Sequence, residues 1–198
     1  ATSMGKLSHL GLEKSPNKST LSYANKVRPW EVYEDLFYTL LDQARRIAET
    51  SQTKFRFKNP LLLLDSSTID LCLSAFNWAH FRRTKGAIKL HLLLDQKGCL
   101  PNWALITDGK TSDVKVAQTL SFKPGTIVAL DRGYIDYSLF QRWSDEDVYF
   151  VTRSKKNMKY RVVDDHPQSE DSNVLSDCTI QLSSSRGKVS HPRTLRLV

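Results

Sequence analysis

The chain has 198 residues, 40% apolar and 25% charged, so it is long enough for a sizeable core and has the composition of a globular protein. Lys and Arg outnumber Asp and Glu by 29 to 21, and the net charge of +8 favours a polyanionic partner. Cys72, Cys99 and Cys178 lack metal-ligand spacing, and no apolar run approaches the roughly 18 to 20 residues of a membrane span. We therefore expect a reduced, cytoplasmic protein that does not enter a membrane.

The N-terminal region combines a polar arm with a strongly patterned helix. Residues 1–28 are rich in Ser, Lys and Gly and offer only short helical pieces, one of them capped by Ser19. From Pro29 onward, apolar side chains recur at helical spacing, which predicts a helix from about residue 30 to 49. We assign residues 1–55 to an N-terminal arm and helical region.

Three strands are predicted next. Residues 61–73 read LLLLDSSTIDLCL, which is typical of a strand. The turn sequence DQKG at 95–98 joins a strand over 87–95 to another over 99–109, which predicts a hairpin. In the first strand of this hairpin, alternate apolar residues share one face, namely Ile88, Leu90, Leu92 and Leu94.

The following segment alternates helices with strands. Asp113 can cap a short helix over 114–120, and residues 126–131 form a continuous apolar run typical of a strand buried on both faces. A helix around 137–143 and a strand over 148–153 complete a mixed α/β order, antiparallel first and parallel later, with flanking helices. We assign this core to 56–160 and a β-rich segment to 161–198, with weak strands at 159–163, 178–182 and 194–198.

Three apolar runs end on an aspartate: Asp65, Asp95 and Asp131. Asp95 is followed by Gln-Lys-Gly, so we interpret it as a turn residue. Asp65 lies inside a strand, where a charge is disfavoured unless something such as a metal ion compensates it. Asp131 ends a buried strand, and a cap or turn role competes there with metal binding. If neighbouring strands bring Asp65 and Asp131 together, a divalent cation removes their mutual repulsion.

Two further groups of titratable residues have simpler explanations. Asp164, Asp165 and His166 are adjacent, and all three residue types can bind a metal ion. Adjacent charged residues in a polar loop are, however, more often simply exposed to solvent. His91 alternates with apolar residues on a strand, so we expect a packed histidine. No Ser/His/Asp arrangement and no phosphate-binding loop is present.

Basic residues gather in two groups beside the predicted sheet. A run of charge is usually a solvated surface, but Trp78, Phe81 and Tyr160 are interleaved here, which suits phosphate contacts combined with base stacking. We therefore expect DNA binding. The first group contains Arg82, Arg83, Lys85 and Lys89, and the second contains Arg153, Lys155, Lys156, Lys159 and Arg161.

Several stretches together resemble a known family. LDSSTIDLCLSAF, FRRTKGAIKLHLLLD, ITDGKTSDVKVA, ALDRGYIDY and YFVTRSKKN are similar to the DDE transposases of bacterial insertion sequences, in the insertion-sequence-four group, over about residues 5–163. The resemblance implies an RNase H-like catalytic core in which Asp65 and Asp131 are two of three metal-binding carboxylates. It also implies a β-rich insertion after the core, which 161–198 would begin.

The resemblance further implies cofactors, partners and chemistry. Family members hold two Mg²⁺ ions, with Mn²⁺ as a substitute, and these activate water or a DNA 3′-hydroxyl for attack on a phosphodiester. The expected substrate is double-stranded DNA at transposon ends and targets, bound by a homodimer that is associated with the nucleoid. In the DRGY sequence, Arg132 and Tyr134 are candidate DNA contacts.

The sequence departs from the family at the third carboxylate. The family Glu belongs to a Tyr, Arg, Glu, Lys signature on a helix, and neither Glu146 nor Glu170 has that context. We therefore predict a transposase fragment, truncated before this Glu, whose 198 residues alone are inactive. Two alternatives stay open, namely a non-catalytic DNA-binding remnant of a transposase and a stand-alone RNase H-like nuclease with a different third carboxylate.

Overall fold

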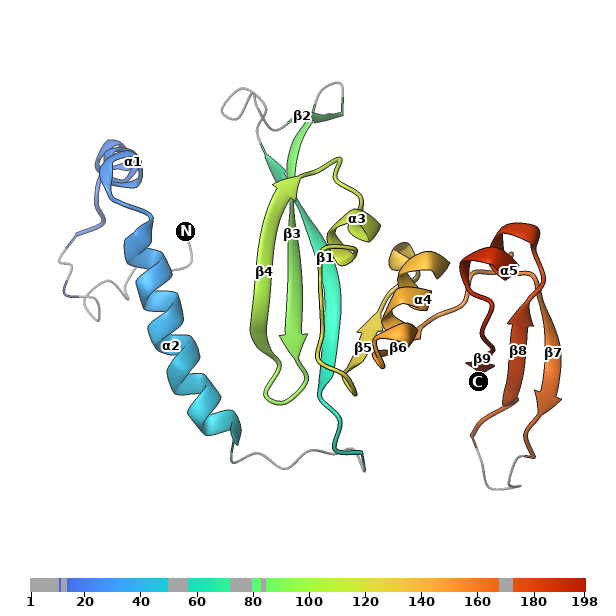
Figure 1. Cartoon of the computed structure of the whole chain (residues 1–198). Coiled ribbons are helices and arrows are strands. Elements are labelled where there is room, and N and C mark those ends of the chain that lie inside the picture. Colours follow the sequence, from blue (N-terminus) through green and yellow to red (C-terminus); the bar gives the residue numbers. More distant parts are fainter. Residues whose placement is uncertain (1–10, 12–13, 50–56, 72–79, 83–84, 168–172) are drawn as a thin grey trace. The chain divides into compact units, whose positions relative to one another are not determined.

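A computed structural model describes residues 11, 14–49, 57–71, 80–82, 85–167 and 173–198 (Figure 1). The chain separates into two compact units, residues 1–46 and 47–198. Each unit is described by itself.

The first unit contains helix α1 (Lys18–Val27) and most of helix α2 (Glu31–Glu49). The bounds of α2 confirm the helix predicted over 30–49, and its charges suit the helix dipole, because Glu31 and Glu34 lie in the first turn and Arg46 in the last. The predicted cap of α1 was wrong: the N-cap is Asn17, so Ser19 lies inside the helix.

The second unit is built around a six-stranded mixed sheet with the order β2-β3-β1-β5-β6 and with β4 paired to β3. Strand β1 is antiparallel to β3 but parallel to β5, and β5 is parallel to β6. This order confirms the predicted mixed α/β class and is that of an RNase H-like domain. The strands are β1 (Leu61–Leu71), β2 (His80–Arg82), β3 (Lys85–Asp95), β4 (Leu100–Asp108), β5 (Ile127–Leu130) and β6 (Tyr149–Thr152).

Strands β3 and β4 form the predicted hairpin, and Asp95 has the predicted turn role. Its Oδ1 accepts a hydrogen bond of 2.8 Å from the backbone N–H of Lys97. Gly98 and Cys99 both have positive φ, 82° and 52°, which the tight reversal requires. The predicted face of β3 is not the buried one, because Ala87, His91 and Leu93 point into the core instead.

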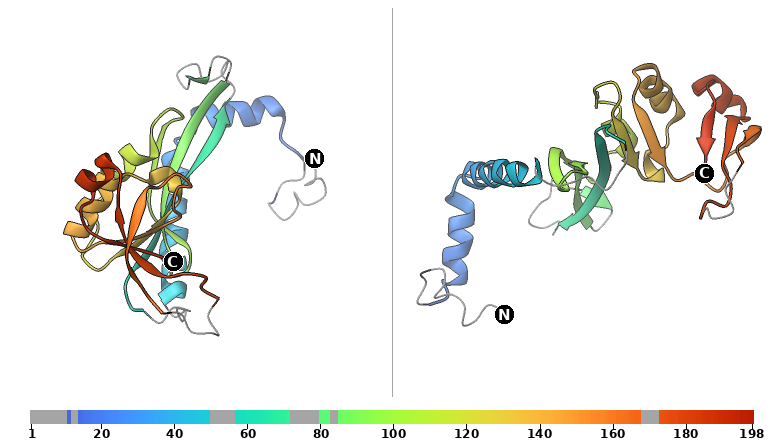
Figure 2. Two further views of the ribbon diagram at one scale, coloured as in Figure 1. Left: turned by 90° about the vertical axis from the view of Figure 1, so that its right-hand side faces the viewer. Right: turned by 90° about the horizontal axis from the view of Figure 1, so that it is seen from below.

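The main core lies between the large sheet and two helices, α3 (Asp113–Ala117) and α4 (Tyr137–Asp145), which cover the same face (Figure 2). Strand β5 alternates buried and half-buried residues, so the prediction of burial on both faces was wrong. The cap of α3 also differs, since Ser112 is its N-cap and Asp113 is its first residue. The core residues include Leu62, Leu64, Val128, Leu130, Leu139, Phe140 and Trp143.

A smaller antiparallel sheet follows, with the order β7-β8-β9. Its strands confirm the β-rich segment predicted from the sequence: β7 (Tyr160–Asp165), β8 (Cys178–Leu182) and β9 (Leu195–Leu197). One face of β8 is buried, through Cys178, Ile180 and Leu182. A short helix that the sequence analysis missed, α5 (Ser185–Ser190), packs against β8 and α4.

Candidate active site

The register of three parallel strands aligns the residues that follow them. Leu64 of β1 pairs with Leu130 of β5, and Leu130 pairs with Thr152 of β6. The residue that follows is Asp65 within β1, Asp131 just after β5 and Arg153 just after β6, so these three stand in one row across the sheet. Neighbouring strands lie about 4.8 Å apart, which makes Asp65 and Asp131 immediate neighbours.

Alternation along each strand places the two aspartates on the same face. Leu64 and Leu130 are buried under the helices, so the residues after them point to the opposite face, where both Asp65 and Asp131 are exposed. Two carboxylates thus share one open surface of the sheet.

Each carboxylate is oriented by a backbone N–H close to it in sequence. Asp65 Oδ1 accepts a hydrogen bond of 2.8 Å from the N–H of Ser66, and Asp131 Oδ1 accepts one of 2.8 Å from the N–H of Gly133. Asp131 therefore has the cap role that competed with metal binding, because it caps the 3₁₀ turn η2 (Arg132–Tyr134). The second oxygen, Oδ2, of each carboxylate accepts no hydrogen bond from any described residue, and neither group forms an ion pair with one.

These carboxylates have the chemistry of a divalent-metal site. Carboxylate oxygens are hard ligands of the kind that Mg²⁺ and Mn²⁺ prefer, and both groups keep a free oxygen on the same open surface. Among the residues that the structure describes, no group of three His, Cys, Asp or Glu side chains could hold a metal ion. As metal ligands, Asp65 and Asp131 would form a pair and not a full coordination shell.

Beneath Asp65, on the core face, lies a cluster of partly buried polar groups around Asp113, of which only His91 is fully buried. Ser66 Oγ donates to Asp113 Oδ1 at 2.9 Å, and Lys89 Nζ donates to the same oxygen at 3.1 Å. His91, which is fully buried as predicted, places Nδ1 3.7 Å from this oxygen and Nε2 3.0 Å from Thr107 Oγ1. Burial lowers the pKa of His91 below its ordinary value, and this effect outweighs the opposing one of the Asp113 carboxylate.

Tyr134 belongs to the turn that holds Asp131, and its side chain is only 1% exposed. Burial raises the pKa of its hydroxyl well above the ordinary value, and the carboxylates of Asp113, Asp65 and Asp131 raise it further, while the nearby Ser66 hydroxyl opposes this rise. The phenol is thus a neutral group inside the core. Its burial leaves no side-chain surface for the DNA contact predicted from the sequence.

Some of the other candidate DNA contacts are exposed to solvent, and others lie outside the described side chains. Arg132 follows Asp131 directly and is exposed, and Arg153, Lys155 and Lys156 are also exposed. Lys89 is engaged by Asp113 and by the carbonyl of Thr111, so it is not a free surface cation. Arg83 lies outside the described residues, and for Arg82 and Lys85 only the backbone is described.

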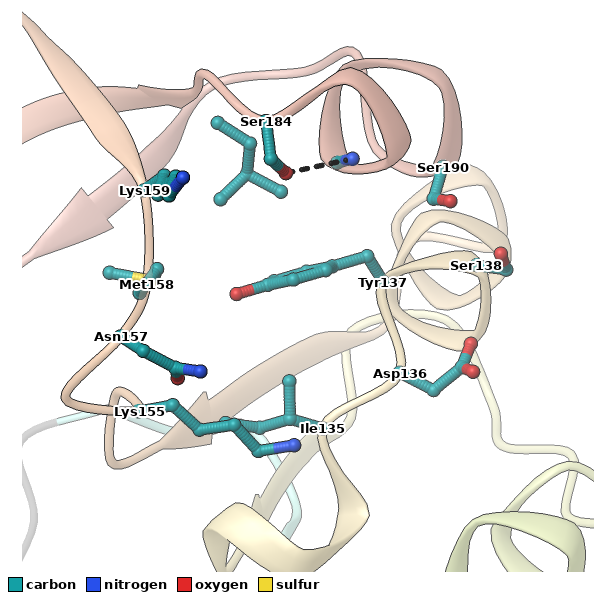
Figure 3. Close-up of a pocket in the computed structure, with 12 residues that line it drawn as sticks. Ile135, Asp136, Tyr137, Ser138, Lys155, Asn157, Met158, Lys159, Ser184 and Ser190 are labelled. Carbon is teal, nitrogen blue, oxygen red and sulfur yellow. Dashed lines mark hydrogen bonds between the residues drawn. The ribbon is translucent and has the colours of Figure 1, made fainter.

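A pocket of about 440 Å³ lies between the segment after η2, the segment after β6 and the small sheet. The ring of Tyr137 projects into it, and Lys155, Met158 and Lys159 line its other side (Figure 3). Asp136, also in the lining, uses its carboxylate to cap α4 by accepting from the N–H of Leu139 at 2.9 Å. Two lysines of the second basic group therefore border a concave surface.

Two of the residues beside the carboxylates were missed by sequence reasoning. Ser66 looked like part of an ordinary strand, and Asp113 was interpreted only as a helix cap. A signal for Ser66 was present, because strand alternation from Leu62 and Leu64 puts it on the core face, where a hydroxyl needs a partner. Asp113 had no local signal, since its partners lie 24 and 47 residues away.

No helix in the described part of the chain is long and apolar enough to cross a membrane.

Comparisons with known proteins agree with this architecture. A model of the transposase DDE domain matches residues 56–190. A Sinorhizobium fredii protein named as transposase y4zB is 29% identical over 186 residues, which are 92% of this chain and 50% of that protein. A Geobacillus stearothermophilus protein named as a transposase for insertion sequence element IS5377 is 26% identical over 166 residues, covering 83% of this chain and 43% of its own length. This chain thus spans about half the length of these relatives. Because the matched segment makes up more than half of it, the chain belongs to the transposase DDE-domain family.

Proposed function

We propose that this chain supplies two metal-binding aspartates of a DNA transposase that cleaves DNA strands at the ends of an insertion sequence and transfers them to a new site. The register that aligns Asp65 with Asp131 on neighbouring parallel strands is the observation that carries this proposal. Family membership supports it, because both aspartates lie inside the matched segment.

The ion in this proposal is Mg²⁺, with Mn²⁺ as a substitute. Members of the family generally use a divalent metal ion. When bound, such an ion neutralises charge on the phosphodiester and activates the attacking oxygen. Asp65 and Asp131 would hold it through the oxygens that their backbone hydrogen bonds leave free. The carboxylates themselves form no covalent bond to DNA, so their contribution is position and charge.

Arg153 is the strongest candidate for a phosphate contact. It stands in the same row as the two aspartates, next to Asp131, and it is exposed. A guanidinium at this place can bind a phosphate oxygen of a strand whose scissile bond lies over the carboxylates. Further phosphate contacts in this proposal come from Arg132, Lys155, Lys156, Arg82, Arg83 and Lys85.

Three finer parts of the function are proposals as well. A third carboxylate completes the site, so the 198-residue chain by itself cleaves no DNA. The substrate is double-stranded DNA, and two copies act on paired ends. The second sheet (β7-β8-β9) is the beginning of the insertion that the family carries between its second and third carboxylates.

Calorimetric titration of the whole chain with Mn²⁺ tests the metal pair. We expect binding in the wild type and a loss of affinity of at least about 100-fold in Asp65→Asn and in Asp131→Asn, since each removes one of two charged ligands. Asp95→Asn is the matched control, because Asp95 also ends an apolar run yet serves a turn, and it should bind like the wild type. Equal Mn²⁺ binding by all four proteins would contradict the proposal.

A parallel assay separates this function from its alternatives. DNA binding by Arg153→Ala should be weaker than wild type, with the slope of log affinity against log salt reduced by about 1. DNA binding without Mn²⁺ binding would favour the non-catalytic remnant. Mg²⁺-dependent DNA cleavage by the wild-type chain, lost in Asp65→Asn, would favour the stand-alone nuclease.

A further inference from the structure

Both candidate metal ligands accept a hydrogen bond from a backbone N–H that is anchored from the core side of the sheet. The N–H that orients Asp65 belongs to Ser66, and the N–H that orients Asp131 belongs to Gly133, which precedes the buried Tyr134. The position of each carboxylate is therefore set by a neighbour anchored on the opposite face of the sheet.

Asp113 anchors Ser66, the residue that carries the first of these N–H groups. Its Oδ1 accepts both the hydroxyl of Ser66 at 2.9 Å and the ammonium of Lys89 at 3.1 Å. Lys89 comes from β3, Ser66 from β1 and Asp113 from α3, so a single carboxylate joins three elements just below Asp65. The side chains of Lys89 and Asp113 are only 14% and 26% exposed, which protects these bonds from competition by water.

The helix that carries Asp113 also contacts the turn that contains the second N–H group. Helix α3, which carries Asp113, packs against η2, which contains Gly133 and Tyr134. Tyr134 is among the largest fully buried side chains, so its ring fixes where Gly133 and its N–H lie. A shift of Asp113 therefore changes the positions of both orienting N–H groups.

Building on the proposed function, we propose that Asp113 is a positioning residue that, through its hydrogen bond with Ser66 and the packing of α3 against η2, couples the two orienting N–H groups and fixes the separation of the Asp65 and Asp131 carboxylates. Asp113 is not itself a ligand in this scheme. Its side chain meets Ser66 on the core face, away from Asp65, and its charge is already compensated by Lys89. Carboxylates that are held at a fixed separation bind a shared cation with less loss of conformational entropy.

Amide hydrogen exchange, followed by NMR without metal, tests the coupling directly. In Asp113→Ala we expect the amides of both Ser66 and Gly133 to exchange at least about tenfold faster than in the wild type. The Lys97 amide, which donates to the Asp95 carboxylate far from Asp113 along the chain, is an internal reference that should not change. Wild-type exchange at Gly133 in this variant, or equal acceleration at Lys97, would overturn the proposal.

Milder variants distinguish a loss of positioning from a general loss of folding. Ser66→Ala removes only the hydroxyl that reaches Asp113, and Ser66→Thr keeps a hydroxyl at the same place. We expect Ser66→Ala to accelerate exchange at both amides and Ser66→Thr to restore wild-type rates. Identical exchange in these two variants would mean that the hydroxyl has no positioning role.

Mn²⁺ affinity links the coupling to the site. We expect the Kd for Mn²⁺ to rise at least about tenfold in Ser66→Ala and in Asp113→Ala, with Ser66→Thr close to the wild type. Wild-type affinity in the first two variants, alongside lost binding in Asp65→Asn, would overturn the positioning role and leave the proposed function intact. If Asp65→Asn also binds Mn²⁺ normally, the proposed function fails. The exchange rates then still decide whether the N–H groups of Ser66 and Gly133 are coupled.

Discussion

The carboxylates of Asp177 and Asp145 differ from those of Asp65 and Asp131 in whether an arginine binds them. Asp177, beside β8, is bound by the guanidinium of Arg196, with one bond of 2.8 Å, and Asp145 of α4 pairs with Arg193 at 2.7 Å. Asp65 and Asp131 have no cation partner among the described residues, although Arg132 and Arg153 are close in sequence or register. The arginine pairs of Asp177 and Asp145 hold parts of the fold together, whereas the unpaired Asp65 and Asp131 are the carboxylates that we propose as metal ligands.

The largest expected effect comes from the core under the large sheet. The ring of Phe140 stacks on Phe150 with centroids 4.0 Å apart, and its side chain is 1% exposed. Phe140→Ala should lower the free energy of unfolding by about 3 to 5 kcal/mol, measured by urea denaturation. Val151→Ala, at a 59% exposed position on the next strand, is the control and should change it by less than about 0.5 kcal/mol. A small effect of Phe140→Ala would mean that the helices do not form one core with the sheet.

The second largest expected effect is a loss of folding stability in acid. Burial lowers the pKa of both His91 and His191 below 6.5, so these groups stay neutral in the folded protein while the unfolded chain takes up protons more readily. Their contribution to stability is therefore fully present above pH 6.5 and is lost as the pH falls from there through the folded pKa values.

Urea midpoints measured from pH 7.5 to pH 4.5 check this prediction. His191→Gln should flatten part of the dependence, because the imidazole is 1% exposed and packs edge-on against Phe150. A midpoint that stays constant, or rises, as the pH falls through 6.5 would contradict the assignment of neutral buried histidines.

A smaller effect is expected from the ion pair that joins the segment before β9 to helix α4. Arg193 and Asp145 are 55% and 52% exposed, so solvent screens their attraction. Arg193→Ala should cost about 0.2 to 1 kcal/mol in urea denaturation, and a double-mutant cycle with Asp145→Asn should isolate the pair. A coupling energy well above 1 kcal/mol would show that this exposed ion pair stabilises the fold more than solvent screening allows.

The smallest effect concerns a single ionisation. Hydrogen bonding to Arg196 holds the pKa of the Asp177 carboxyl below its usual value. In Arg196→Met this pKa should rise toward the ordinary value in a ¹³C NMR titration, and Arg193→Met should leave it unchanged. An unaltered Asp177 titration in Arg196→Met would remove the contrast between paired and unpaired carboxylates.

The sequence predicted most of the strands and the proximity of Asp65 to Asp131 because both depend on local patterns, whereas the role of these aspartates as metal ligands stays a prediction. Apolar runs that stop on Asp65 and Asp131 needed only strand alternation and parallel pairing to become neighbours. The DDE-domain match confirms the resemblance to transposases of insertion sequences. The subgroup, the domain boundaries and the truncation before a third carboxylate stay predictions.

Long-range contacts decided what the sequence could not predict. Helix α5 has no apolar periodicity. It is capped by Ser184, whose Oγ accepts a hydrogen bond from the N–H of Gly187, and it packs against β8 and α4. On β3, the face with His91 and Lys89 is covered despite its polar residues, because Asp113 and Thr107 satisfy them. Tyr134 looked like a DNA contact within DRGY, but its ring belongs to the core.

Crystals of the chain soaked in Mn²⁺ test the central claim most directly, because anomalous scattering locates the ion without assumptions about its ligands. The account predicts an anomalous peak about 2.0 to 2.3 Å from one oxygen of Asp65 and from one oxygen of Asp131. A peak at Asp164 and Asp165 instead, or Mn²⁺ bound by only one of the two strand-end carboxylates, would contradict it.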